Sequence, residues 1–182
     1  MAREERDKPD RSTRHARRLR RRLSTGTAIV VVTVVAIAVG WFAYRAVADL
    51  PGEKFADQGN LHITRETDPH VPYNSEPPTS GPHLPYIAPW GVHTRPITRE
   101  LQVHNLEDGG VVVQYSCECP ELAERLAKIV RRYDKQVILA PYPDMKAKIA
   151  LTAWTRLLTL DDFDEAKIVR FIGAYRGVDH HK

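Results

Sequence analysis

The chain of 182 residues contains only two cysteines, Cys117 and Cys119. It has no glycine-rich phosphate-binding loop, no nucleophile-elbow pattern around Ser80 and no internal repeat. Turn chemistry explains the Ser-Gly-Pro sequence at Ser80, so nothing favours a hydrolase with a catalytic serine. The mean hydropathy of −0.41 excludes a membrane protein with many spans.

Net positive charge is confined to one terminal block. Residues 1–24 contain ten Lys and Arg against four acids, a net charge of +6, whereas the whole chain carries only +4. The remainder is therefore slightly acidic, and no basic patch is evident there. This distribution excludes nucleic acid as a partner, despite a pI of about 9.1. We expect the tail itself to be disordered, because it is too polar to fold.

Charged residues are absent from Leu23 to Tyr44, a stretch of 22 residues. At a rise of ~1.5 Å per residue, a helix of this length spans the ~30 Å hydrocarbon layer of a membrane. Positive charge stays in the cytoplasm, so the N-terminus is predicted to lie inside and the C-terminal part outside. A cleaved signal peptide is the alternative, because Ala46-Val47-Ala48 fits a cleavage site. Its apolar region would, however, usually have ~7–15 residues.

The uncleaved anchor predicts a single-pass protein of the cell membrane. Its parts would be a cytoplasmic tail (1–24), a transmembrane helix (25–48), a linker (49–60) and an extracytoplasmic domain (61–182). Nine of the 13 prolines lie between Pro51 and Pro96, which excludes regular helix and central strand there. We therefore expect residues 61–98 to form an ordered, irregular wrap over the core, with one edge strand near 61–67.

The second half of the chain shows regular periodicity. Strands are predicted at 111–115, 136–140 and 149–158, the last with Trp154 inside it. A helix is predicted from Pro120 to Tyr133, because Leu122, Leu126, Ile129, Val130 and Tyr133 share one face. A second helix follows a capping-box pattern at 162–165 and ends before Gly177. The order strand, helix, strand, strand, helix predicts an α+β or α/β fold, a two-layer sandwich.

Several strings resemble a bacterial family known as domain of unknown function 3105. They are Tyr73-Asn-Ser-Glu-Pro-Pro-Thr-Ser-Gly-Pro-His83, Trp90-Gly91, Val103-His-Asn-Leu-Glu-Asp-Gly-Gly-Val111, Ile138-Leu-Ala-Pro-Tyr-Pro143 and Ile149-Ala-Leu-Thr-Ala-Trp154. The resemblance covers about residues 55–178 and implies a membrane-anchored extracytoplasmic domain, but no activity. The family pattern often has a second His where this chain has Asp108. If that His is a ligand or base elsewhere, Asp108 must substitute for it here.

Histidines are the first candidates for chemistry. His70, His83 and His93 lie in the predicted wrap, and Glu107 and Asp108 follow His104 by three and four positions. Imidazole and carboxylate groups together suit Zn²⁺ or Cu²⁺, although the spacings match no standard metal motif. The alternative is structural: His83 and His104 would only hydrogen-bond the proline-rich loops and hold them against a strand.

The two cysteines precede Pro120 at a strand–helix junction, where a helix N-terminus favours a thiolate. Outside the cell, Cys117 and Cys119 could form a disulfide, a redox pair or soft ligands for Cu(I). They could equally be two small residues that cap a helix. Met145 could add a thioether ligand, although a single Met usually only packs.

The leading functional hypothesis is a non-catalytic domain that binds copper or zinc. Its predicted ligands are His83 and His104, joined by His70, Glu107, Asp108, Cys117 and Cys119. An alternative is a thiol–disulfide oxidoreductase that uses the Cys-x-Cys pair. A third is an interaction module in which Trp90 and Tyr86 face a membrane or extracytoplasmic protein partner.

Overall fold

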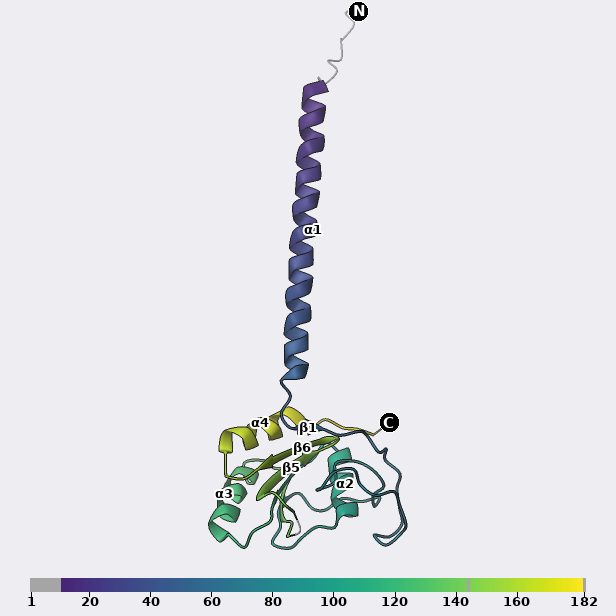
Figure 1. The fold of residues 1–182 in the computed structure, drawn as a ribbon, viewed down its shortest axis with the longest axis vertical. Coiled ribbons are helices and arrows are strands. Elements are labelled where there is room, and N and C mark those ends of the chain that lie inside the picture. The colour runs from purple at the N-terminus through teal and green to yellow at the C-terminus, as the bar shows by residue number, and fades with distance from the viewer. Residues whose placement is uncertain (1–10, 144, 182) are drawn as a thin grey trace, which may run out of the picture. The chain divides into compact units, whose positions relative to one another are not determined.

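A computed structural model describes residues 11–143 and 145–181, with side chains from residue 26 onward except at 43 and 46–48. The chain divides into two compact units, Met1–Leu50 and Pro51–Lys182. The first unit contains one long helix, α1 (Arg11–Ala48), drawn in purple and blue in Figure 1. In the part of the chain that the structure describes, no helix is long and apolar enough to cross a membrane. The transmembrane helix over 25–48 stays a prediction.

Helix α1 also differs from the predicted disordered tail over residues 1–24. The helix already begins at Arg11, and residues 1–10 lie outside the described part of the chain. Arg, Ala and Leu dominate the sequence from 14 to 23, and these residues have high helix propensity. Polarity alone predicted disorder there, whereas local propensity favours helix.

The second unit contains a six-stranded mixed sheet in the order β1-β6-β5-β3-β4-β2. The strands are β1 (Glu53–Lys54), β2 (Gly91–Val92), β3 (Val111–Tyr115), β4 (Val137–Pro141), β5 (Ile149–Ala153) and β6 (Arg156–Leu160). Strands β2, β4 and β3 run parallel, and β5, β6 and β1 continue the sheet antiparallel. Helix α3 (Pro120–Val130) makes the crossover between β3 and β4, which a parallel pair requires.

One face of the sheet is covered by α3 and α4 (Glu165–Tyr175). Val111 and Val113 of β3 point to this face and pack with Leu126 of α3 and Phe171 of α4. The other face carries Val112 of β3, together with α2 (Arg99–Glu107) and the proline-rich segment. Figure 1 shows α2 on the opposite side of the strands from α3 and α4.

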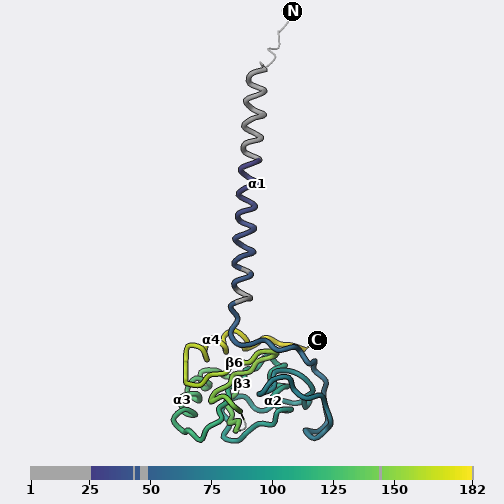
Figure 2. The backbone as a smooth tube through the Cα atoms, in the orientation of Figure 1, coloured from purple at the N-terminus to yellow at the C-terminus, as the bar shows by residue number. Residues whose placement is uncertain are grey.

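The α+β class predicted from the sequence is confirmed, but the two-layer arrangement is wrong. Because α2 and the wrap cover the second face of the sheet, the domain has three layers. Residues 61–98 form no helix, and Figure 2 shows them in blue and teal on the same side as α2. Instead of an edge strand near 61–67, the structure has one isolated parallel bridge, between His62 and His83.

Element boundaries differ from prediction in three places. The predicted strand 149–158 is a hairpin, β5–β6, that turns at Trp154-Thr155. Thr155 adopts a φ of 59° and is held there by backbone hydrogen bonds to Thr79 and from Phe55. The expected linker 49–60 contributes β1 to the sheet edge. Helix α3 ends at Val130 rather than at Tyr133, and Asp164 caps α4 through the backbone N–H of Lys167.

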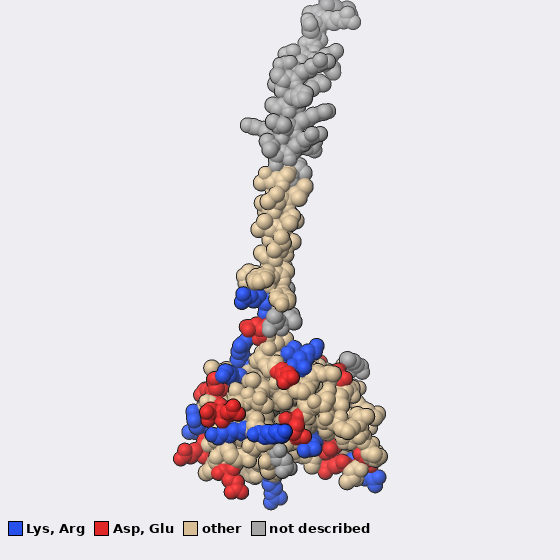
Figure 3. All heavy atoms as spheres, in the orientation of Figure 1, with Lys and Arg blue, Asp and Glu red and all other residues tan. Residues whose placement is uncertain are grey.

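Charged side chains of both signs are interspersed over the face of the second unit that Figure 3 shows. Buried polar side chains, by contrast, gather in one place. Gln102, Asn105 and Glu107 lie on α2, and His83 lies in the wrap that packs beside it. The fold therefore concentrates its interior polarity on the α2 side of the sheet.

Candidate metal centre

Helix α2 carries three of the candidate ligands on its last turn. His104 and Glu107 are three residues apart, and Asp108 is the C-cap, so all three lie on one side of the helix end. The chain then turns at Gly109, whose φ of +75° suits glycine after a helix. The side-chain amide of Asn105 pairs with both backbone groups of Ala88, which holds the wrap against α2.

The wrap supplies two more imidazoles. The backbone N–H of His83 donates to Leu61 at 3.0 Å, and the N–H of Ile63 donates to His83 at 2.8 Å. This short bridge places His62 beside His83, with their ring centroids 4.9 Å apart. The His83 side chain is fully buried, whereas that of His62 is 48% exposed. One imidazole therefore lies in the interior and the other at its edge.

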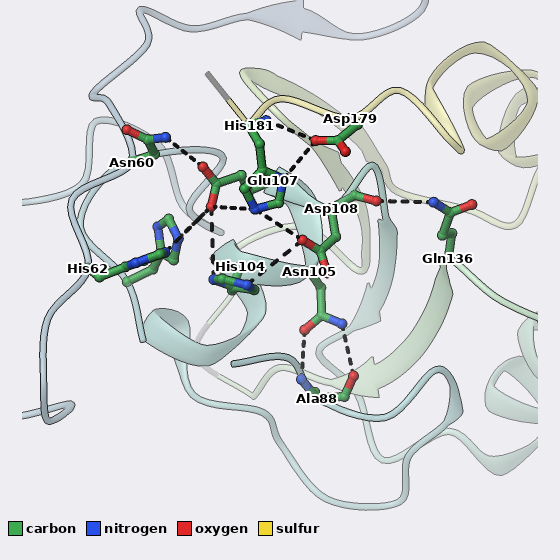
Figure 4. Close-up of polar contacts among 11 residues, drawn as sticks. Asn60, His62, Ala88, His104, Asn105, Glu107, Asp108, Gln136, Asp179 and His181 are labelled. Carbon is green, nitrogen blue, oxygen red and sulfur yellow. Dashed lines mark hydrogen bonds and ion pairs between the residues drawn. The ribbon is translucent and has the colours of Figure 1, made fainter. Parts of the chain in front are cut away.

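The carboxylate of Glu107 lies at the centre of the cluster (Figure 4). Its side chain is fully buried, and its Oε1 accepts a hydrogen bond of 2.7 Å from Asn60 Nδ2. Four imidazole nitrogens surround Oε2: His83 Nε2 at 2.9 Å, His181 Nε2 at 3.6 Å, His62 Nε2 at 3.8 Å and His104 Nδ1 at 3.9 Å. Burial acts to raise the pKa of Glu107, but the Asn60 hydrogen bond and the neighbouring imidazoles outweigh it and lower that pKa.

His83 has a defined orientation. Its Nδ1 lies 2.8 Å from the carbonyl oxygen of Gly81, which can only accept, so Nδ1 must carry a proton and donate. In the neutral ring, Nε2 then has a lone pair that faces Glu107 Oε2 at 2.9 Å. Two acceptors this close repel each other unless a cation lies between them. That cation is either a proton shared by His83 and Glu107 or a metal ion.

Among the described residues, none forms a hydrogen bond with His104 Nδ1, which is buried in the cluster. Buried polar atoms in folded proteins are nearly always paired, so this ring nitrogen is a candidate to bind a ligand. Burial lowers the pKa of His104 below its ordinary value, against the opposite effect of Asp108. The ring is therefore held in the neutral form, which is the form that coordinates metals.

The C-terminal segment closes the cluster. The backbone N–H of His180 donates to the Glu107 carbonyl at 2.9 Å, and that of Gly177 donates to Gly109 at 2.8 Å. His181 Nε2 then lies 3.4 Å from Asp108 Oδ1, while its Nδ1 lies 2.7 Å from Asp179 Oδ1. The hydrogen bond to Asp179 raises the pKa of His181. A carboxylate behind a histidine is a common way to orient a metal ligand.

In the described part of the chain, two groups of residues could hold a metal ion. They are His62, His83, His104 and Glu107, and His104, Asp108 and His181; within each group the ligand atoms lie within 4.8 Å of one another. Ligands that share one Zn²⁺ at bond lengths of ~2.0–2.2 Å lie about 3–3.5 Å apart. Small side-chain rotations would therefore complete the coordination.

The structure brings together four of the seven predicted site residues: His83, His104, Glu107 and Asp108. His70 belongs to neither group, and its Nε2 faces Glu100 Oε1 at 3.6 Å. Cys117 and Cys119 are joined in a disulfide. They therefore offer no thiolate in this state, and both also lie outside the two groups.

Sequence reasoning did not identify His62 and His181 as ligands. It also did not identify Asn60, which donates to Glu107, or Asp179, which contacts His181, as supporting residues. The only available signals were the His180-His181 pair and the position of His62 ahead of the proline-rich strings. Both residues join the cluster through long-range backbone contacts, which spacing along the chain cannot reveal.

Other candidates have structural roles. Met145 is buried against Tyr142 and Leu157, and Ser80 Oγ accepts a hydrogen bond from the backbone N–H of Gln58. Of the two aromatic residues expected to face a partner, Tyr86 is exposed, whereas Trp90 packs on the core beside Gly110.

Comparisons with known proteins agree with the sequence resemblance. A search of curated proteins and a search of solved structures found no match. A family model described as "Protein of unknown function (DUF3105)" matches residues 64–182, which include every cluster residue except Asn60 and His62. This match covers well over half of the chain, and the chain therefore belongs to the DUF3105 family.

Proposed function

We propose that the Pro51–Lys182 unit is a transition-metal-binding domain for zinc or copper. The ion is held by the imidazoles of His62, His83 and His104 and by the carboxylate of Glu107. Three imidazoles and one carboxylate form a ligand set that suits Zn²⁺ and Cu²⁺ and contains no soft ligand for Cu(I).

The observation that carries this proposal is the unpaired, buried Nδ1 of His104 beside the Glu107 carboxylate. The purely structural alternative requires every buried imidazole to be satisfied by hydrogen bonds. His83 meets that requirement when a proton lies between its Nε2 and Glu107, because the ring then ties the Gly81 loop to α2. His104 Nδ1 does not, and a metal ion would provide the missing partner.

The test is calorimetric titration of the chelator-treated full-length protein with Zn²⁺ or Cu²⁺ at pH 7.5. We expect saturable binding of at least one ion per chain, weakening as the pH falls below about 6.5, because protonated imidazole cannot coordinate. At a free metal concentration of 100 times Kd, the ion should raise the free energy of unfolding by about 2.7 kcal/mol.

Three variants make the test specific. His83→Gln combined with His104→Gln should abolish binding, and His62→Ala should weaken it without unfolding the protein, because His62 is half exposed. His93→Ala is the matched control, since His93 Nε2 contacts the Pro89 carbonyl and His93 belongs to neither candidate ligand group. Absence of heat above dilution for the wild-type protein would refute the proposal. Equal weakening by His62→Ala and His93→Ala would place the ion elsewhere.

A second candidate function is thiol–disulfide exchange, which the Cys117–Cys119 disulfide favours. Cys119 is the N-cap of α3, where the helix N-terminus stabilises a thiolate. Both cysteines line a surface groove with Tyr115 and Pro141. Alkylation of both thiols after reduction should abolish exchange with a dithiol substrate, yet leave metal binding intact. Loss of metal binding on alkylation would contradict the separation of the two sites.

The location of the domain is a further proposal that rests on the sequence pattern of residues 1–48. The basic block beside the uncharged stretch Leu23–Tyr44 supports a cytoplasmic N-terminus and an exterior C-terminal unit. Protease added to intact cells should then digest the Pro51–Lys182 unit. Its survival until the membrane is broken would contradict this location.

A further inference from the structure

The two ring nitrogens of His104 face different carboxylates. Nδ1 lies 3.9 Å from Glu107 Oε2, on the side of His62 and His83. Nε2 lies 3.8 Å from Asp108 Oδ1, and His181 Nε2 approaches the same oxygen at 3.4 Å. Figure 4 shows His104 between the two carboxylates, with separate contacts to each. The two groups of candidate ligands therefore share this one residue.

Resting on the function proposed above, we infer that the cluster holds two metal ions joined by the imidazole ring of His104. The first ion binds His62, His83, Glu107 and His104 Nδ1. The second binds Asp108, His181 and His104 Nε2. The neutral ring carries one N–H proton, which is released to solvent when both nitrogens coordinate, so the bridge is an imidazolate anion.

The contacts of His104 support this arrangement. Within residues 11–143 and 145–181 its Nδ1 finds no hydrogen-bond partner, and the 3.8 Å from Nε2 to Asp108 exceeds a hydrogen-bond length. The ring is thus positioned by α2 and its packing, with its side chain only 12% exposed, while both nitrogens face acidic groups at nearly equal distances. A purely structural histidine in the interior would pair at least one nitrogen closely.

Local charge also favours two cations. Two adjacent divalent ions repel each other, and negative charge between and around them offsets this repulsion. The carboxylates of Glu107 and Asp108 supply two negative charges, and the imidazolate supplies a third. Asp179 adds a carboxylate behind His181, and its contact with Nδ1 at 2.7 Å directs Nε2 toward the second position.

The two positions differ in access to solvent. At the first position the side chains of His83 and Glu107 are fully buried, and that of His62, at the edge, is 48% exposed. At the second, Asp108 is 30% exposed and His181 is 48% exposed. Three protein ligands at an exposed position leave coordination sites for water or a small anionic ligand, as in open metal sites. The second ion is therefore the exchangeable one, and it is the ion that an external ligand would contact.

The test is stepwise loading of the metal-free full-length protein with Cu²⁺, followed by elemental analysis and electron paramagnetic resonance. We expect two ions per chain. The first equivalent should give the signal of an isolated Cu²⁺, and the second should diminish the total signal, because an imidazolate bridge couples the two electron spins antiferromagnetically. Asp108→Asn combined with His181→Ala should reduce the loading to one ion with an undiminished signal. His93→Ala should retain two ions and the coupling.

The outcomes separate this inference from the proposed function. One ion per wild-type chain, unaffected by Asp108→Asn with His181→Ala, would overturn the second position and leave the metal-binding function standing. No bound ion would overturn both. Two ions with a full, uncoupled signal would overturn the His104 bridge. Both changed side chains are partly exposed, and circular dichroism of the variant checks that it remains folded.

Discussion

The two faces of the sheet are built by different means. The face under α3 and α4 is packed almost wholly with aliphatic and aromatic side chains, such as Leu126, Ile168 and Phe171. The face under α2 and the wrap contains the buried polar groups, among them Gln102, Asn105, Glu107 and His83. The first face stabilises the domain by burial of apolar surface. On the second face, burial of polar groups away from water offsets part of that stabilisation. The residues that contribute most to stability and those of the candidate metal centre therefore lie on opposite sides of one sheet.

The largest expected effect is on the apolar face. Leu126→Ala should lower the free energy of unfolding by about 2–5 kcal/mol, because the Leu126 side chain is fully buried in the middle of α3. Metal binding by the folded fraction should be unchanged. Chemical denaturation followed by circular dichroism measures the first, and calorimetric titration the second. Lys128→Ala, on the exposed side of the same helix, is the control and should change stability by no more than about 0.5 kcal/mol.

The next largest effect on stability is expected at Gly109, which follows the C-cap of α2. Gly109→Ala should cost about 1–3 kcal/mol, because the residue has a φ of +75° and a Cβ would lie 2.8 Å from the backbone of Val178. Val178 belongs to the segment that leads to His181, so a shift of its backbone would displace His181. Metal loading at the position formed by His104, Asp108 and His181 should therefore also fall. Gly173→Ala in α4 is the control: no atom lies within 4 Å of its Cβ position. It should instead stabilise the protein by about 0.5–1 kcal/mol. Equal effects of the two changes would contradict the coupling of Gly109 to the site.

The smallest effect on stability is expected from a substitution beside the metal centre, at Asn60. Asn60→Ala removes the 2.7 Å hydrogen bond to Glu107 Oε1 and should weaken metal binding about 10- to 100-fold. Stability should fall by only about 0.5–1.5 kcal/mol, the usual net contribution of one hydrogen bond. Asn74→Ala is the matched control, since it also loses an amide hydrogen bond, to the Ala56 carbonyl, but away from the cluster. Similar affinities for both variants would show that Asn60 does not support the Glu107 carboxylate.

The same contrast explains what could be predicted from the sequence. On the apolar face, the periodicity of Leu122, Leu126, Ile129 and Val130 identified α3, and the β-branched run 111–115 identified β3. Hydrophobic patterning is informative there because burial is apolar. On the other face, α2 buries Gln102, Asn105 and Glu107, so its pattern does not look amphipathic and the helix was missed.

The candidate site could be predicted only where its chemistry is local. His104, Glu107 and Asp108 are adjacent in sequence, and the choice of His83 followed from the proline-rich string that ends with it. His62 and His181 reach the cluster through the bridge to His83 and through the backbone contact of His180 with Glu107. Such pairings depend on the whole tertiary structure, and no spacing rule encodes them.

The origin of the cluster residues in distant parts of the chain has a mechanical consequence. Asn60 and Glu107 are separated by 47 positions, and the final residues of the described chain return to the same point. An ion bound there would act as a cross-link that closes several long loops at once, and closure of long loops removes the most entropy from the unfolded chain. Bound metal should therefore slow proteolysis of the C-terminal segment. Removal of the metal by a chelator should make that segment the first part of the domain to become susceptible to protease.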